Sequence, residues 1–308
     1  MAPIEQTFST FSPEQAAAYA KTRGSGYSPV LYQAILDYHS EHPRDVLLDV
    51  GSGPGTVVFD LLSHFKRAYG CDTGFQMIEQ AKKTATECGF SKEQAVFKVS
   101  AAEQCADAFS TCQGEVDVIT VAMAAHWFDM PAFYKAAAKL PRPGGALAIW
   151  TCSSMLVHPS VPNHEKIQDI LSDLEDGMLA PHVEEGNTIS RNAYRDLKLP
   201  WDDVTSRGLF GEGSFERVDW DLHGIPSAPR GLDGTPGPFL HGRETTIPEM
   251  EQTLGSAGMV IRWREANPDK ALTDEDVVTV TARRLQEVVG VSEKLSLGHS
   301  TIFLLLRR

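Results

Sequence analysis

Residues 47–56 read LLDVGSGPGT, an apolar run that ends in an acid and opens into glycines at alternate positions. The apolar run predicts a buried strand, and GTVVFDLLSHF (55–65) predicts the helix that follows it. Glycines at this spacing let the backbone turn sharply and approach a flat ligand closely. Free N–H groups at the start of the helix would face an anion, either a carboxylate or a phosphate. The residues concerned are Asp49, Gly51, Ser52, Gly53 and Gly55.

Two nucleotide-binding motifs can be compared with this stretch. A Walker loop requires a lysine followed by Ser or Thr after its last glycine, and no lysine follows Gly55. A dinucleotide fingerprint, G-x-G-x-x-G, fits at Gly51 and Gly53 but has Thr56 in place of its third glycine. The pattern present is an acid, one residue and then G-x-G-x-G, which leaves a ligand without phosphate open.

Apolar runs and helical patterns alternate through the first half of the chain, which is typical of βαβ units and a mostly parallel sheet. The sequence therefore predicts an α/β fold with a doubly wound sheet of seven strands. The apolar end STIFLLLRR predicts a last strand inside the sheet, since both its faces must be covered. The predicted strands are 45–51, 67–72, 95–103, 115–124, 145–152, 214–223 and 300–308, and the main helices are 55–65, 74–89, 246–265 and 274–290.

A second acid ends the second predicted strand. Asp72 stands 19 residues beyond Gly53, where a carboxylate in a sheet of this type can accept hydrogen bonds from both hydroxyls of a ribose. Ala102 and Glu103 lie at the end of the third predicted strand and could meet an adenine edge. The alternative for Glu103 is an ordinary solvated loop acid or helix cap.

Composition restricts the partners. The net charge is −13 and the longest basic cluster is Arg307-Arg308, so nucleic acid and anionic membranes are disfavoured as partners. No window resembles a secretory signal or a membrane-spanning helix. The five cysteines contain no CxxC pair, which favours reduced thiols and a cytoplasmic location.

A metal site is not expected. The histidines His158, His164 and His182 match no zinc spacing, and HExxH is missing from the sequence. His39 and His42 lie near a predicted helix end, where we expect both to be solvated.

At this point the sequence resembles the class I S-adenosylmethionine-dependent methyltransferases. The carriers of the resemblance are LLDVGSGPG, Asp72, AAE at 101–103 and LPRPGGALAIW after the fourth strand. More narrowly, YAKTRGSGY (19–27), VAMAAHWFDMPAFYKAAAKLPRPGGALAIW (121–150) and LGSAGMVIRWREANPD (254–269) are similar to the trans-aconitate methyltransferase group.

The resemblance implies S-adenosyl-L-methionine as cofactor and S-adenosyl-L-homocysteine as product. It places the adenosine between Asp72, Thr73 and Met77 on one side and Ala102 and Glu103 on the other. Where the group has a proline after Arg23, this chain has Gly24. The residues predicted to bind the cofactor are Tyr19, Arg23, Asp49, Gly51, Ser52, Gly53, Gly55, Asp72, Thr73, Met77, Ala102, Glu103, Ala124, Trp127 and Phe128.

The resemblance also implies one domain over residues 1–308. An N-terminal lid segment (1–28) precedes the cofactor-binding half (29–152). A helical cap insertion (153–212) is expected over the carboxyl edge of the sheet, followed by the C-terminal half of the sheet with its helices (213–308).

The segment AAHWFD follows the fourth strand and supplies the candidate catalytic residues His126 and Trp127. An alcohol or phenol acceptor needs a general base, for which His126 is the candidate, whereas a carboxylate acceptor is already ionised. In the family this segment mainly shapes the cofactor pocket. Arginines could pair with a carboxylate-bearing acceptor, or they could be ordinary surface charges. Residues in segments that could line the acceptor cavity are Arg191, Arg195, Trp201, Phe239, Arg243, Trp263 and Arg264.

The sequence thus predicts methyl transfer to a carboxylate or hydroxyl oxygen of a small acid or secondary metabolite, by a monomer or homodimer. Two alternatives stay open. One is an enzyme that keeps the cofactor but catalyses a cyclisation or elimination, and the other is a cofactor-sensing regulatory protein.

Overall fold

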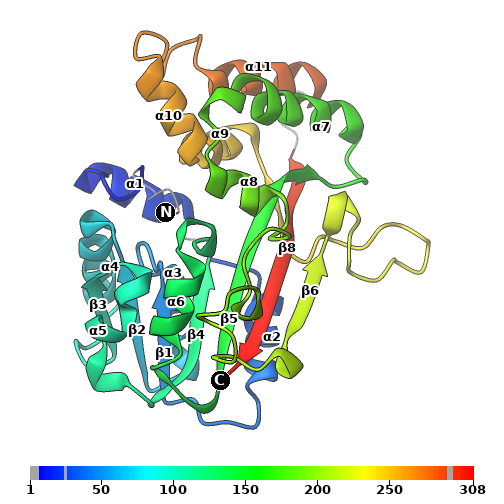
Figure 1. Cartoon of the computed structure of the whole chain (residues 1–308). Helices are drawn as coiled ribbons and strands as arrows, with labels where there is room; N and C mark the ends of the chain where they lie inside the picture. The colour runs from blue at the N-terminus through cyan, green and yellow to red at the C-terminus, as the bar shows by residue number, and fades with distance from the viewer. Residues whose placement is uncertain (1–6, 24–25, 290–293) are drawn as a thin grey trace. The chain divides into compact units, whose positions relative to one another are not determined.

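The computed structural model describes residues 7–23, 26–289 and 294–308, which form two compact units (Figure 1). The first unit comprises Met1–Thr151, Tyr194–Val218 and Ile302–Arg308. The second comprises Cys152–Ala193 and Asp219–Thr301. Of the predicted cap insertion, 153–193 belongs to the second unit and 194–212 to the first.

The first unit is built on a sheet with the strand order β3-β2-β1-β4-β5-β8-β6. The pairs β1–β2, β1–β4, β2–β3 and β4–β5 are parallel. The predicted doubly wound, mostly parallel sheet is therefore confirmed, and the apolar last strand β8 lies between two others as expected. The strands are β1 (Val46–Val50), β2 (Arg67–Asp72), β3 (Ala95–Val99), β4 (Val116–Ala122), β5 (Pro141–Val157), β6 (Glu216–Trp220) and β8 (Leu295–Arg307), of which β5, β6 and β8 continue into the second unit.

The helices of the first unit follow from the sequence periodicity. Helix α4 buries Met77, Ile78, Ala81 and Ala85, which are the apolar stripe that its sequence predicts. Helix α6 begins after Asp129, whose side chain accepts from the Ala132 N–H at 3.3 Å. It ends at Ala137, and the two prolines beyond it open β5. The helices are α1 (Pro13–Arg23), α2 (Pro29–Tyr38), α3 (Thr56–Leu61), α4 (Phe75–Glu87), α5 (Cys105–Ala108) and α6 (Met130–Ala137).

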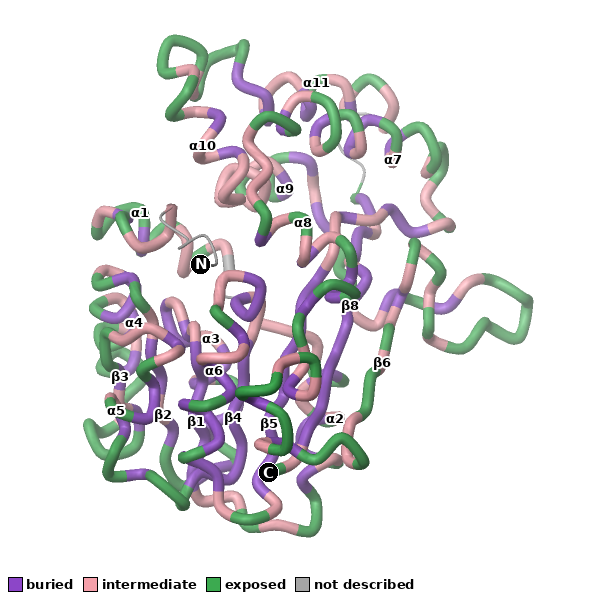
Figure 2. Tube along the Cα trace, in the orientation of Figure 1, coloured by how far each residue is buried: buried purple, intermediate pink, exposed green. Residues whose placement is uncertain are grey.

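The buried core of the first unit follows its central strands, which are drawn as buried along their length in Figure 2. All five residues of β1 are buried, and so are the first six of β4. Strands buried on both faces are what a parallel sheet between helical layers requires. Because β1, β2 and β4 are parallel, their carboxyl ends reach the same edge of the sheet, where the predicted site residues lie.

The second unit is mainly helical. It contains α7 (His164–Ser172), α8 (Glu185–Arg191), α9 (Ile247–Gly255), α10 (Gly258–Ala266) and α11 (Val277–Val289). One hydrophobic cluster joins α7, α9 and α11 to the strand segments, and Ile167, Met250 and Leu285 are its fully buried members on these helices.

Three details of the second unit differ from the sequence prediction. A short strand, β7 (Gly242–Thr245), pairs antiparallel with β8, so the sheet has eight strands and not seven. The predicted helix 246–265 is two helices, α9 and α10, which are separated by Ser256 and Ala257. The fifth strand runs well beyond the predicted 145–152, because β5 continues from the first unit into the second.

His39 also differs from expectation. It is fully buried, its Nε2 lies 2.8 Å from the Pro43 carbonyl oxygen, and its ring stacks on His42. Burial lowers the pKa of His39, since a charged imidazole would lose its hydration there. The prediction that His39 is solvated is therefore wrong.

Within the part of the chain that the structure describes, no helix combines the length and the apolar character that crossing a bilayer requires.

Candidate functional site

The glycine loop turns back on the second strand as soon as β1 ends. The N–H groups of Gly51 and Ser52 donate to the Cys71 carbonyl oxygen at 2.8 and 2.9 Å. Gly51 has a φ of +75°, and a Cβ there would lie 2.5 Å from the Cβ of Ala124 and 3.2 Å from the ring of Phe128. Only glycine fits at this position, so the loop packs directly against the residues that follow β4.

Asp72 connects the glycine loop to the start of α4. Its Oδ2 accepts from the Gly53 N–H at 2.9 Å, and its Oδ1 accepts from the Gly74 N–H at 2.8 Å. Burial raises the pKa of Asp72, while these two hydrogen bonds act against that rise. A carboxylate oxygen can accept more than one hydrogen bond, so Asp72 keeps capacity for a further donor.

Asp49 lies beneath this loop and is 1% exposed. Its Oδ1 accepts from the Thr120 hydroxyl at 2.7 Å, across the β1–β4 pair. Among the described residues, neither Asp49 Oδ2 nor the buried Ser52 Oγ has a hydrogen-bond partner. Burial raises the pKa of Asp49 to about 8, and the charge of Asp72 adds to the effect. The loop therefore contains buried polar atoms whose hydrogen-bonding capacity is not used.

Glu103 holds the loop after β3 to the loop after β4. Its Oε1 accepts from the Asp129 N–H at 2.8 Å. Ala102 beside it is buried, and the 3₁₀ turn that contains both residues packs on α6. Glu103 is thus neither an isolated solvated acid nor a cap of its own helix.

The remaining predicted residues on β2 and α4 lie near Asp72 in the chain but differ in burial. Thr73 is exposed, whereas Met77 is 2% exposed and faces the core. A Cβ on Gly74 would lie 3.1 Å from Met77 Cγ and 3.1 Å from the Phe8 carbonyl oxygen. The N-terminal segment therefore approaches the residue that donates to Asp72.

Tyr19 belongs to this N-terminal segment. Its ring centroid lies 5.3 Å from that of Phe8 and 6.0 Å from that of Phe11, and its helix α1 contacts α4. Arg23 ends α1, and its side chain lies outside the described residues, as does Gly24. Tyr27 packs edge-to-face on Trp150 of β5 at 5.3 Å.

His126 and Trp127 lie in the 3₁₀ turn Ala125–Trp127 just after β4. His126 is 8% exposed, and its Nδ1 lies 2.9 Å from the hydroxyl of Tyr194. Burial lowers the pKa of His126 to about 3, so the imidazole is neutral at physiological pH. Trp127 is half-buried, and its ring centroid lies 5.1 Å from that of His126.

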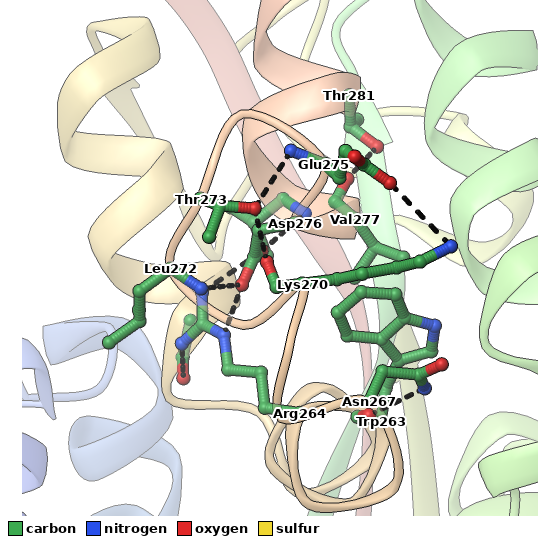
Figure 3. A network of polar contacts seen from close by, with 12 residues as sticks. Trp263, Arg264, Asn267, Lys270, Leu272, Thr273, Glu275, Asp276, Val277 and Thr281 are labelled. Atoms are coloured by element: carbon green, nitrogen blue, oxygen red, sulfur yellow. Dashed lines mark hydrogen bonds and ion pairs between the residues drawn. The ribbon is translucent and has the colours of Figure 1, made fainter.

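Two of the arginines predicted for an acceptor cavity are paired with acids of the second unit. Arg264 makes two contacts with Asp276, at 2.7 and 3.2 Å (Figure 3). Arg191 pairs with Asp176 and, at 3.4 Å, with Glu175. These guanidinium groups stabilise the second unit itself, which favours the structural reading of both residues.

The other candidates for that cavity are spread over both units. Phe239 is buried against His158, and Arg243 donates to the Thr253 hydroxyl at 2.8 Å. In the first unit, Trp201 packs edge-to-face on Phe215, while Arg195 is exposed.

In residues 7–23, 26–289 and 294–308, no three His, Cys, Asp or Glu side chains form a group that could hold a metal ion. The absence of a metal site stays a prediction from the sequence.

Two contacts of the site were not predicted. Thr120 is a polar residue in an otherwise apolar buried strand, and this was a usable signal for a partner of Asp49. Tyr194 gave no such signal, because it lies in an irregular polar and aromatic stretch, 68 residues from His126.

Residues 41–198 match the family model described as a methyltransferase domain. A protein of Dictyostelium discoideum named as a methyltransferase is 36% identical over 252 residues, covering 80% of this chain and 84% of its own. A Saccharomyces cerevisiae protein named as an S-adenosylmethionine-dependent methyltransferase is 22% identical over 299 residues, with 96% of both chains covered.

Solved structures agree in fold. A structure described as a type II methyltransferase from Anaeromyxobacter dehalogenans has a TM-score of 0.62 and 21% identity, and it covers 92% of this chain and 97% of its own. At this identity the similarity concerns the fold alone.

Proposed function

Because this chain belongs to the methyltransferase domain family, which supports S-adenosylmethionine as its cofactor, we propose that it methylates an oxygen atom of a small organic acid. The observation that carries the proposal is that Asp72, the glycine loop and the turn after β4 lie together at one edge of the sheet. The two alternatives, a cofactor-dependent enzyme that does not methylate and a regulatory protein, are not favoured by this membership.

The glycine loop fits an adenosyl ligand. A Cβ on Gly53 would meet no atom within 4 Å, so the loop is open at this position, whereas Gly51 is closely packed. Asp72 can accept from ribose hydroxyls, and the unused capacity of Asp49 and Ser52 lies in the same loop. When bound, the cofactor supplies an electrophilic methyl group on a sulfonium sulfur.

The chain itself contributes by holding and orienting the cofactor and the acceptor. Orientation of reacting groups can lower a barrier by roughly 7–11 kcal/mol. In this proposal the residues after β4 close one side of the pocket, since Ala124 and Phe128 approach Gly51. Tyr19 and Arg23 of the N-terminal segment are proposed to close the other side, and Thr73, Met77, Ala102 and Glu103 to surround the adenosine.

The state of His126 supports a carboxylate as the acceptor. A general base works best when its pKa lies near the working pH, and a pKa of about 3 makes His126 a weak proton acceptor. A carboxylic acid is already ionised at neutral pH and needs no base. The trans-aconitate group predicted from the sequence fits this class of acceptor. Membership of that group stays a proposal, as do a cytoplasmic location, a monomer or homodimer, and the exclusion of nucleic acid.

The binding test is calorimetry with S-adenosylmethionine and S-adenosylhomocysteine. We expect micromolar dissociation constants that Asp72→Ala weakens by about 1.5–3 kcal/mol, the value of hydrogen bonds to a charged group. Glu79→Ala is the matched control, because Glu79 is exposed on α4 and pairs only with Lys82 among the described residues. An unchanged affinity of Asp72→Ala would remove the ribose assignment.

The acceptor test is a screen of carboxylic acids, trans-aconitate among them, and of phenols with a labelled methyl donor. Label in an ester product supports the proposal, whereas label in a phenol ether would show that the acceptor is a hydroxyl group. Turnover of an acceptor without label in the product would support the non-methylating alternative.

A further inference from the structure

His126 and Tyr194 form a buried pair in the first unit. The His126 Nδ1 lies 2.9 Å from the Tyr194 hydroxyl oxygen, and the two ring centroids are 5.8 Å apart. His126 is 8% exposed and Tyr194 is 2% exposed. A hydrogen bond with so little competing water fixes the relative position of its two partners.

The backbone holds Tyr194 in this position at a conformational cost. Ala193 and Tyr194 have φ values of +57° and +53°, in the left-handed region that non-glycine residues rarely adopt. Such strain persists only where the surrounding structure enforces it, and it is concentrated at functional sites. The strained dipeptide carries the phenol to the turn after β4.

The chemistry of the pair determines where the imidazole proton resides. Burial keeps His126 neutral, so one ring nitrogen carries a proton and the other accepts. A phenol hydroxyl is a good donor, and an unprotonated imidazole nitrogen is a better acceptor than a phenol oxygen. This difference favours donation from the Tyr194 hydroxyl to Nδ1, which would leave the ring proton on Nε2.

We propose that Tyr194 is a positioning residue that fixes His126 as the Nε2–H tautomer, so that His126 serves the reaction as a hydrogen-bond donor to an anionic acceptor oxygen and not as a base. The donor role rests on the proposed function, whereas the tautomer does not. A donor at this point would orient a carboxylate without removing a proton from it.

The tautomer is measured directly by the nitrogen-15 chemical shifts of the His126 ring at neutral pH. We expect the wild-type protein to show the proton on Nε2, and Tyr194→Phe to shift the tautomer populations. Tyr134→Phe is the matched control, since it removes another buried hydroxyl, which donates to the Lys198 carbonyl oxygen at 3.1 Å. A wild-type proton on Nδ1 overturns the proposal even if no variant folds.

The donor role is measured by methyl transfer to a carboxylic acid. We expect Tyr194→Phe to lower kcat about tenfold, the rate equivalent of one hydrogen bond, with unchanged affinity for S-adenosylmethionine. Tyr134→Phe should leave both kcat and the affinity for S-adenosylmethionine unchanged.

His126→Gln and His126→Ala separate a donor from a base. The Gln amide can still donate near the Nε2 position, so it should retain more kcat than Ala. Equal losses in Gln and Ala overturn the donor role. Absence of any methyl transfer by the wild-type protein, with the tautomer as expected, would contradict the proposed function and leave the role of Tyr194 in fixing the tautomer intact.

Discussion

Two aspartates, one in each unit, are almost completely buried but are bonded in opposite ways. Asp276 of the second unit accepts four hydrogen bonds, two from Arg264 and one each from the Leu272 and Val278 N–H groups (Figure 3 shows the pair with Arg264). Asp49 of the first unit accepts one, from Thr120, and among the described residues its second oxygen has no partner.

The pKa values follow from this difference. Burial acts to raise the pKa of Asp276, but its hydrogen bonds with Arg264, Leu272 and Val278 outweigh burial and lower it. Burial raises the pKa of Asp49 to about 8. A fully bonded buried acid therefore stabilises its surroundings, whereas an incompletely bonded one costs stability and keeps capacity for a ligand.

The largest effect is expected at Asp276. Asp276→Ala leaves the Arg264 guanidinium, 22% exposed, without its carboxylate, so the free energy of unfolding should fall by about 3–5 kcal/mol. Urea unfolding followed by tryptophan fluorescence measures this loss. Asp274→Ala is the control in the same loop, because Asp274 is 97% exposed, and it should behave as wild type. A loss below about 1 kcal/mol would contradict the stabilising role of the Asp276 carboxylate.

Asp49→Asn should change the free energy of unfolding in a pH-dependent way, and in the direction opposite to that of Asp276→Ala. Because folding raises the pKa of Asp49 from 3.8 to about 8, its contribution to stability is fully present below pH 4 and is lost as the pH rises to 8. The neutral Asn does not titrate. Relative to wild type, Asp49→Asn should therefore gain a few kcal/mol between pH 4 and 8, at about 1.4 kcal/mol per pKa unit.

Unfolding curves across that pH range are the measurement. Asp276→Asn should show the opposite trend. The contribution of the wild-type Asp276 carboxylate is present above the unfolded pKa and is lost as the pH falls, so the difference between this variant and wild type should shrink in acid. Parallel curves for wild type and Asp49→Asn would show that Asp49 is ionised in the folded protein.

Two glycines test how closely the loop around Asp49 is packed. Gly51→Ala adds left-handed strain and a contact of 2.5 Å with Ala124, so we expect a loss of about 2–3 kcal/mol. Gly53→Ala adds strain alone, about 1 kcal/mol, since its Cβ meets no atom within 4 Å. Thermal unfolding compares the pair, and equal losses would contradict the packing at Gly51.

Ser52→Ala should have the smallest effect. Its buried hydroxyl has no hydrogen-bond partner in the described part of the chain, so its removal should change the free energy of unfolding by less than about 0.5 kcal/mol without ligand. Thr120→Val is the contrasting variant, because it removes the hydrogen bond to Asp49 and should cost about 1–3 kcal/mol. A large loss in Ser52→Ala would reveal a partner for the hydroxyl.

Much of the first unit could be predicted from local sequence. The strand 67–72 matches β2 residue for residue, and the apolar stripe of α4 matches its buried face. The second unit was predicted less well, because β7 lies at the end of a Gly/Pro-rich loop whose pairing with β8 has no local signal. The predicted glycine, Asp72 and Ala124–Phe128 groups do come together, since parallel strands deliver their carboxyl ends to one edge.

The sequence by itself determined the parallel sheet, the glycine turn after Asp49 and the acid at the end of β2, because period and turn chemistry act over a few residues. Only the tertiary structure decided which side chains those residues meet. Thr120 is 71 residues from Asp49, and Tyr194 is 68 residues from His126. Burial then set the protonation of both sites, since the loss of water depends on everything packed around a group and not on its neighbours in the chain.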